Sequence, residues 1–433
     1  MPKPLRVRLL WAIIFASSFV LSANSTGRNS VASPVPHQDE EENVSEDNEG
    51  QVKVEVLADG LNQPYAVAVN PDSGTVFVSD SGAGRVVRVV DGAIEEVITG
   101  YPMGKFGSSE SDVGPLGLAF IDGQNLVVGS GGDPDGNDQL RVYPVSENGQ
   151  PAVNFDGTPV ETSDEDSDED GDDSVADDDS DSTEDESGSV EGEATRDDES
   201  LEAEASSPEE GSEEASEELP AQPIEAYSLS SDEGQAVEGE FYGIIASDRN
   251  IYVTGAGDEA KGWVSRADVL DGKLTNFSRS IATSEQTGTS SPTAIARSPE
   301  GFIVVSQIGQ NDDSADSVIS FYDESNEELG NSVFETGLNE IRGLAYGPVR
   351  GRLFAVDMSL ANPESAGLYK LVSDGGSGCK AELIIELDRP TALAFDQESN
   401  LYVTVLGPAD SEQPGGQLLK ITGLDIEPSS EDN

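Results

Sequence analysis

The sequence predicts an all-β protein, a six-bladed β-propeller that is closed by its N-terminal strand and carries one long, disordered acidic insertion. Three observations lead to this fold class. A unit of two apolar strands joined by a short turn recurs six times along the 433 residues, the copies follow one another at nearly constant spacing, and an unpaired strand precedes the first copy. Such spacing is typical of propeller blades.

The repeated unit consists of an apolar strand, a turn rich in Gly, Pro, Asp or Asn, and a second apolar strand. The copies are PYAVAVNPDSGTVFVSD from Pro64, GPLGLAFIDGQNLVVGS from Gly114, FYGIIASDRNIYVTG from Phe241, SPTAIARSPEGFIVVSQ from Ser291, IRGLAYGPVRGRLFAVD from Ile341 and RPTALAFDQESNLYVTV from Arg389. The aligned residues Phe77, Val127, Tyr252, Ile303, Phe354 and Tyr402 lie 50, 125, 51, 51 and 48 residues apart. Because one interval alone is anomalous, we place an insertion between the second and third units.

The ends of the chain give an independent check on the number of blades. After its two repeat strands, the sixth unit supplies only QLLKIT before the sequence turns polar at Asp425, so this blade is one strand short. The unpaired segment VKVEVLA at 52–58 can fill the gap. Pairing the N-terminal strand into the last blade would close the ring and hide an open sheet edge.

The insertion is dominated by Asp, Glu and Ser, with 29 acidic residues and one basic residue from 161 to 218. A segment of this composition cannot bury enough apolar surface to offset the entropy lost on ordering. The chain therefore divides into a signal peptide at 1–25, a disordered acidic spacer at 26–50, blades 1 and 2 at 51–145, the disordered insertion at 146–222, blades 3 to 6 at 223–424 and a tail at 425–433.

The N-terminus predicts export. Lys3, Arg6 and Arg8 precede an apolar run and the small residues Ala23–Ser25, which is the pattern of a cleaved secretory signal. The run is short for a membrane span, so we expect a secreted, periplasmic or envelope protein, as a monomer, without a span after cleavage. Its single cysteine, Cys379, cannot form an internal disulfide, so packing and strand pairing must hold the fold.

The charge limits the partners. The formal net charge is −63, and about −30 remains on the predicted propeller when the spacer and insertion are set aside. Phosphate backbones and anionic membrane surfaces would be repelled, so we expect no nucleic acid partner. Cations and basic proteins remain possible.

The units resemble NHL-like six-bladed propellers, whose repeats combine a Pro, an apolar strand, a Gly- or Asp-bearing turn and a strand such as LYVTV. The stretch GRVVRVVDGAIEEVITGYP, with GPLGLAF and GSGGDP, is also similar to exported propellers encoded with scytonemin biosynthesis in cyanobacteria. The resemblance covers residues 52–145 and 224–423. It implies the fold and leaves function open, because such propellers host hydrolases, lyases, oxidoreductases and binding modules.

Histidine is absent from every predicted blade, since the only one, His37, lies in the spacer. A Ser-His-Asp triad, an imidazole base and a His-ligated zinc are therefore excluded from the propeller. Relatives that depend on histidine, such as quinoprotein sugar dehydrogenases, are disfavoured. Calcium-dependent lactonases that resemble the gluconolactonase family need only oxygen ligands and remain compatible.

Two groups of residues are candidates for a site. Residues that end second strands or begin first strands would meet at one mouth of the central channel, where they could bind a ligand or calcium: Tyr65, Asp80, Tyr242, Gln307, Arg342 and Asp357. The loop GGDPDGND offers a second set of possible calcium ligands: Asp133, Asp135, Asn137 and Asp138. The mouth residues could instead be ordinary blade-end residues that make turn hydrogen bonds, because the glutamate and asparagine ligands of the lactonase family have no clear counterpart here. The loop could be a solvated connection between blades, because Gly136 is not at the position that an EF-hand requires.

From these features we expect a non-catalytic binding propeller that presents loops to a protein or glycan partner. The alternative is a calcium-dependent enzyme of the lactonase or hydrolase type with the metal at the channel mouth. No cofactor other than calcium is indicated. A third possibility is ion buffering by the acidic run, which would bind calcium weakly and without specificity.

Overall fold

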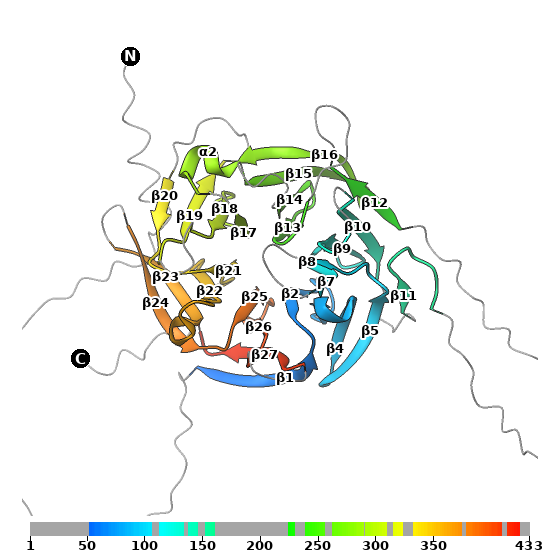
Figure 1. Ribbon diagram of the computed structural model, residues 1–433, viewed down its shortest axis with the longest axis horizontal. Coiled ribbons are helices and arrows are strands. Elements are labelled where there is room, and N and C mark those ends of the chain that lie inside the picture. The colour runs from blue at the N-terminus through cyan, green and yellow to red at the C-terminus, as the bar shows by residue number, and fades with distance from the viewer. Residues whose placement is uncertain are drawn as a thin grey trace, which may run out of the picture. The chain divides into compact units, whose positions relative to one another are not determined.

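The structure is a computed structural model that describes residues 52–105, 112–133, 137–145, 152–160, 224–229, 239–255, 262–289, 291–309, 315–323, 332–374, 378–408 and 414–424. Almost all regular structure in these ranges is β-strand, and the strands form six sheets of four or five strands arranged around a central axis, with one additional two-stranded hairpin (Figure 1). The predicted six-bladed propeller is confirmed. The predicted signal peptide, spacer and tail lie outside the described residues.

Each sheet is one blade, and its first strand lies nearest the axis (Figure 1). Blade 1 contains β2 (Pro64–Val69), β3 (Val76–Asp80), β4 (Arg85–Val90) and β5 (Ala93–Thr99), with the 3-10 turn η1 (Ser81–Ala83) between β3 and β4. Blade 2 contains β8 (Pro115–Asp122), β9 (Asn125–Ser130), β10 (Gln139–Pro144) and β12 (Glu225–Ser228). The small hairpin of β6 (Gly104–Lys105) and β7 (Asp112–Val113) precedes blade 2.

The remaining blades repeat this order. Blade 3 contains β13 (Ile244–Ala246), β14 (Asn250–Gly255), β15 (Trp263–Leu270) and β16 (Lys273–Ala282), followed by the short helix α2 (Thr283–Thr287). Blade 4 contains β17 (Pro292–Arg297), β18 (Ile303–Gln307), β19 (Val318–Tyr322) and β20 (Ser332–Glu335). Blade 5 contains β21 (Ile341–Tyr346), β22 (Leu353–Asp357), β23 (Gly367–Ser373) and β24 (Cys379–Glu386), with the 3-10 turn η2 (Pro363–Ser365).

Blade 6 confirms the predicted closure of the ring. Its strands β25 (Pro390–Phe395), β26 (Leu401–Val405) and β27 (Gly416–Thr422) are completed by the N-terminal strand β1 (Lys53–Leu61). β1 pairs antiparallel with β27, from Lys53 opposite Thr422 to Leu61 opposite Gly416. The pairing covers an edge of β27 that would otherwise be free to bind another chain.

The core lies between neighbouring blades. The second strands β3, β18, β22 and β26 are buried along their whole length, which is why they read as continuous apolar runs rather than as alternating patterns. Between blades 5 and 6, for example, Phe354 packs with Leu393 and Leu401. Packing of this kind replaces the disulfides that the sequence lacks.

The boundaries of the insertion differ from the prediction in two places. β12 at Glu225–Ser228 pairs with β10, so the acidic run interrupts blade 2 instead of separating blades 2 and 3. Residues 152–160 are ordered, and β11 (Val153–Asn154) extends blade 1 by pairing in parallel with β5. The physical reason is Phe155, whose carbonyl accepts a 2.7 Å hydrogen bond from the Tyr143 hydroxyl. Residues 161–223 lie outside the described part of the chain.

Within the described ranges, no helix has the length and apolar character needed to cross a membrane.

Candidate functional site

The end of the propeller at which the six innermost strands begin is called here the proximal end, and the opposite end is the distal end. Five of the six innermost strands, all except β13, shift register at or just after their second residue, which marks a β-bulge. Bulges turn a side chain away from the regular pleat and are common beside functional sites. The residues at this aligned second position are Tyr65, Leu116, Tyr242, Thr293, Arg342 and Thr391. The repeat therefore places one side chain from each blade at the proximal end.

Two tyrosines occupy the centre of the proximal end. The rings of Tyr65 and Tyr242 meet edge to face, with centroids 6.2 Å apart, and pack with Val113 and Leu116. The Tyr242 hydroxyl donates a 2.8 Å hydrogen bond to the carbonyl oxygen of Thr391. Tyr242 belongs to blade 3 and Thr391 to blade 6, so this bond joins opposite sides of the ring.

A charged pair lies against the tyrosines. The Arg342 guanidinium carbon is 5.7 Å from the centroid of the Tyr242 ring, and its Nε donates a 3.1 Å hydrogen bond to Oε1 of Glu340. A second, shorter contact joins its Nη2 to the same oxygen. The side chains of Arg342 and Glu340 are 13% and 14% exposed, so the ion pair is largely desolvated but still reachable from solvent.

The phenols in this cluster are neutral at ordinary pH. Burial raises the pKa of Tyr65, and the nearby Arg342 and Arg389 lower it only in part. Burial also raises the pKa of Tyr242 well above its usual value. Both hydroxyls therefore stay protonated and can donate a hydrogen bond.

The other three residues predicted at the mouth serve the local loops. Asp357 accepts hydrogen bonds from the backbone N–H groups of Asn339 at 3.0 Å and Glu340 at 2.6 Å. Asp80 accepts from the backbone of Asn62 at 2.5 Å and from Arg85 at 2.8 Å. These carboxylates stand at the same position of blades 5 and 1, and both are fully buried.

Gln307 ends the second strand of blade 4, and its amide donates to the hydroxyls of Thr283 at 3.0 Å and Thr287 at 2.9 Å, which attaches β18 to α2. The structure thus brings Tyr65, Tyr242 and Arg342 together in one cluster. It uses Asp80, Gln307 and Asp357 to fix the loops around that cluster. Whether any of the six binds a ligand stays a prediction.

The second predicted set also makes contacts within the protein. Asp133 forms a 3.3 Å ion pair with Arg141, and Asp138 accepts hydrogen bonds from the backbone of Gly239 at 2.9 Å and Glu240 at 3.1 Å. Asn137 is exposed, and Asp135 lies outside the described residues. In the part of the chain that the structure covers, no three His, Cys, Asp or Glu side chains are grouped to hold a metal ion. Whether either set binds calcium stays a prediction.

Glu340 was not among the predicted residues, although it bonds to Arg342 more closely than any of them. It directly precedes the repeat unit IRGLAY, in a loop where the repeat itself fixes no residue type. The sequence indicates this pairing in one way only: Glu340 lies two residues before Arg342, which occupies the aligned second position of the unit.

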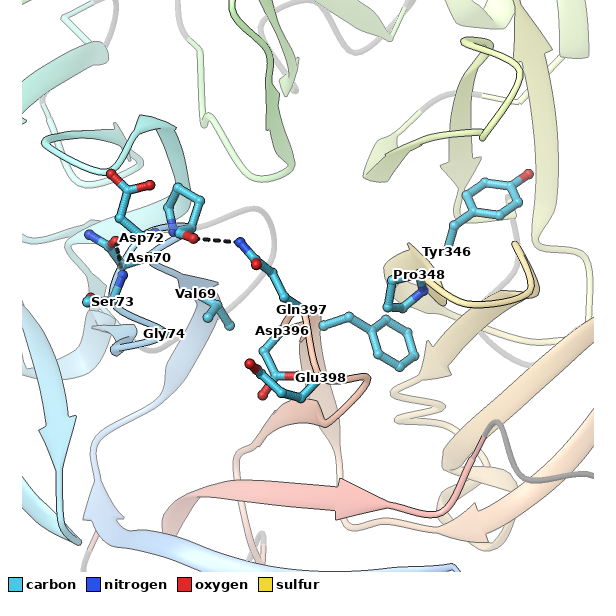
Figure 2. Close-up of a pocket in the computed structure, with 12 residues that line it drawn as sticks. Val69, Asn70, Asp72, Ser73, Gly74, Tyr346, Pro348, Asp396, Gln397 and Glu398 are labelled. Carbon is cyan, nitrogen blue, oxygen red and sulfur yellow. Dashed lines mark hydrogen bonds between the residues drawn. The ribbon is translucent and has the colours of Figure 1, made fainter.

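At the distal end, a pocket of about 420 Å³ lies among the turns that follow the innermost strands of blades 1, 5 and 6. Figure 2 shows the pocket with the residues that line it: Val69, Asn70, Pro71, Asp72, Ser73, Gly74, Tyr346, Pro348, Phe395, Asp396, Gln397 and Glu398. The sequence gives no sign of this pocket, because Asn-Pro-Asp-Ser-Gly and Asp-Gln-Glu-Ser-Asn have the composition of ordinary hairpin turns.

No family model matches the sequence, and no curated protein matches it either. Solved structures of similar fold include the apo form of the soluble aldose sugar dehydrogenase from Escherichia coli, at 11% identity and a TM-score of 0.48, which covers 86% of this chain and 100% of that one. The PQQ-bound aldose sugar dehydrogenase from Streptomyces coelicolor has 12% identity and a TM-score of 0.46, covering 86% and 99%. A gluconolactonase from Xanthomonas campestris has 12% identity and a TM-score of 0.45, covering 86% and 90%.

The expectation of a non-catalytic scaffold that presents loops to a partner finds no support among these structures, which are enzymes. At such low identities and TM-scores the likeness extends to the fold alone and carries no activity over to this chain. The function must therefore be argued from the residues of this protein.

Proposed function

We propose that the protein is a hydrolase that acts on a small lactone or ester at the proximal end. The observation that supports this most is the largely buried Glu340–Arg342 pair, whose guanidinium lies over the ring of Tyr242 at the bulge of β21. A carboxylate, a guanidinium and phenol groups in a desolvated site are sufficient for metal-free ester hydrolysis.

In the proposed reaction, Glu340 accepts a proton from a water molecule as the water oxygen bonds to the substrate carbonyl carbon. Arg342 stabilises the negative charge that develops on the carbonyl oxygen. The ester C–O bond then breaks, and the leaving alkoxide takes the proton from Glu340, which gives a hydroxy acid from a lactone or an acid and an alcohol from an ester. Tyr65 would orient the substrate by hydrogen bonding, because the hydroxyl of Tyr242 is engaged with Thr391. All of these roles are filled by side chains of the protein, and the assay below tests whether calcium contributes.

The test is a hydrolysis assay of the full chain on five- and six-membered lactones and p-nitrophenyl esters, with and without added calcium or chelator. Glu340→Gln keeps a hydrogen-bond acceptor for Arg342 but removes the base, so kcat/KM should fall about 100-fold. Because the variant also removes the negative charge beside a largely buried guanidinium, its melting temperature is measured and activity is compared for folded protein only. Glu364→Gln, an exposed position in η2 of the same blade, is the control. Absence of hydrolysis across the panel, or full activity in Glu340→Gln, would refute the proposal. If a chelator abolished the activity, the mechanism would require a bound metal ion.

We further propose export, with cleavage after the small residues at 23–25, and membership of the NHL-like propellers encoded with scytonemin biosynthesis. What supports both is the sequence pattern described above. Mass spectrometry of the N-terminus of the protein recovered outside the cytoplasm tests the first point. An intact Met1 there would refute cleavage.

A further inference from the structure

The distal pocket differs from the proximal cluster in the balance of its polar groups. Of its twelve lining residues, three are acidic and none is basic. Apolar surface from Val69, Pro71, Pro348 and Phe395 completes the lining. A pocket with an apolar wall and a few polar groups of one kind is the usual form of a small-molecule site.

The side-chain donors in the lining are already used. The amide of Asn70 donates to the carbonyl of Gly123 at 2.8 Å, the amide of Gln397 to the carbonyl of Pro71 at 2.6 Å, and the hydroxyl of Ser73 to Thr75 at 3.0 Å. The backbone N–H groups of Asp72 and Ser73 point to Asn70. The Tyr346 hydroxyl points away from the other labelled residues in Figure 2. A ligand must therefore bring its own donors.

The acceptors remain available. The carboxylates of Asp72 and Glu398 accept no hydrogen bond from any described residue, and both residues are exposed. Asp396 is 8% exposed and accepts from Asn400 and Tyr402, so it adds fixed negative charge to the wall. Burial and the charges of Asp396 and Glu398 raise the pKa of Tyr402 to about 12, which agrees with a negative potential on this side.

The positions of the pocket's carboxylates favour an organic cation over a metal ion. No group of three acidic residues within the described chain is close enough to hold a metal ion. Figure 2 shows Asp72 on the turn of blade 1 and Glu398 on the turn of blade 6, with the hydrogen bond from Gln397 to Pro71 between the two turns. Negative groups on two separate turns suit a ligand with separate positive groups along an apolar chain.

We propose that the distal pocket binds a small organic cation with two or more ammonium groups, that is, a polyamine. One ammonium group contacts Glu398 and Asp396, another contacts Asp72, and the methylene chain packs on the prolines and Val69. This site is independent of the proposed hydrolysis, because it lies at the other end of the propeller.

The test is calorimetric titration of the full chain with spermidine and putrescine at physiological salt. We expect one saturable site, weakened about tenfold in Glu398→Gln and in Asp72→Asn. Glu300→Gln removes the same charge from the equivalent turn of blade 4, outside the pocket, and should leave the affinity unchanged. Weak binding of these amines to the acidic run at 161–218 should be the same in all variants, so it does not affect the comparison of their affinities.

Three outcomes would overturn the proposal. They are the lack of a saturable site, an equal loss of affinity in Glu300→Gln, and displacement of spermidine by an equimolar amount of calcium. A lysine tripeptide, titrated in parallel, separates free amines from protein side chains. Binding of the tripeptide without binding of spermidine would count against a small polyamine.

Discussion

The two ends of the propeller are built from the same six strands, yet they treat polar groups in opposite ways. At the proximal end, polar side chains reach across blades, as Tyr242 does to Thr391 and as Thr293 does to the carbonyl of Ile341 at 2.7 Å. At the distal end, Asn70 and Asp396 also bond within their own turns, and the bonds of Asn70 to Gly123 and of Gln397 to Pro71 join neighbouring blades only. The proximal end therefore contains a bond across the whole ring, whereas the distal end leaves a pocket among the turns of blades 1, 5 and 6.

The difference arises from the order of the strands. Five of the six innermost strands enter through a bulge at the proximal end, which frees the second side chain. At the distal end the innermost strands leave through tight turns, which use the polar groups of the turn residues. Substitutions in the proximal cluster should thus affect stability as well as function, whereas substitutions of the exposed distal carboxylates Asp72 and Glu398 should affect binding alone.

The largest effect is expected when the proximal ion pair is broken. Arg342→Met leaves the Glu340 carboxylate largely buried without its partner, which should lower the free energy of unfolding by about 3 kcal/mol in urea titrations. The pair of Arg88 and Glu95 is the matched control, because Glu95 is 44% exposed. Arg88→Met should cost less than about 1 kcal/mol. Equal losses in the two variants would contradict the contrast between the ends.

The bond across the ring should have a smaller effect. Tyr242→Phe removes the hydrogen bond to Thr391 and leaves a carbonyl without its donor, so we expect a loss of about 1 kcal/mol. Tyr346→Phe is the control, because its hydroxyl makes no hydrogen bond to a described residue. Chemical denaturation of both variants measures the difference. A loss in Tyr346→Phe as large as that in Tyr242→Phe would show that the distal hydroxyl is also structural.

The pH dependence of stability should show a further, smaller difference. Burial raises the pKa of Asp357, although its two backbone donors offset part of the shift. The folded state therefore binds this proton more tightly than the unfolded state, and the resulting stability is lost as pH rises through the raised pKa. The free energy of unfolding, measured from pH 3.5 to 7, should fall less steeply in Asp357→Asn. The exposed Asp122→Asn controls for the loss of one acid; an identical slope in the two variants would refute the assignment.

The smallest effect is expected from the acidic run. Deletion of 161–218 keeps β11, β12 and their contacts, so the melting temperature should change by less than about 2 °C. Extending the deletion to 152–229 also removes Phe155 and Ile224 from the cluster between blades 1 and 2, and should lower the melting temperature clearly. Calorimetric scans of both variants test this. A large loss from the shorter deletion would mean that the run contributes to the fold.

The sequence was sufficient for the architecture because the fold depends on repeated local signals. Apolar strands and turn residues recur at near-constant spacing, and the closing strand could be inferred from a missing one. The strand β12 escaped prediction because its four residues, Glu-Ala-Tyr-Ser, are too few and too polar to form a pattern. Its position depends on tertiary contacts, such as the hydrogen bond from the Leu274 backbone to the Tyr227 hydroxyl at 3.1 Å.

The candidate site was only partly predictable for a related reason. Alignment of the units correctly placed Tyr65, Tyr242 and Arg342 at one end, because strand position is a property of the repeat. It could not show that Asp80 and Asp357 would be occupied by backbone donors, or that Glu340 would pair with Arg342. These depend on loop conformations, which differ from blade to blade.

The closure of blade 6 also has a consequence for the order of events during synthesis. β1 is the first strand of the propeller to leave the ribosome, but its partner β27 is the last, more than 350 residues later. The earlier blades can assemble as they emerge, while the ring stays open until the final strand is available. Pairing over such a separation is slow, so the last blade should set the rate at which the newly made protein becomes resistant to proteases.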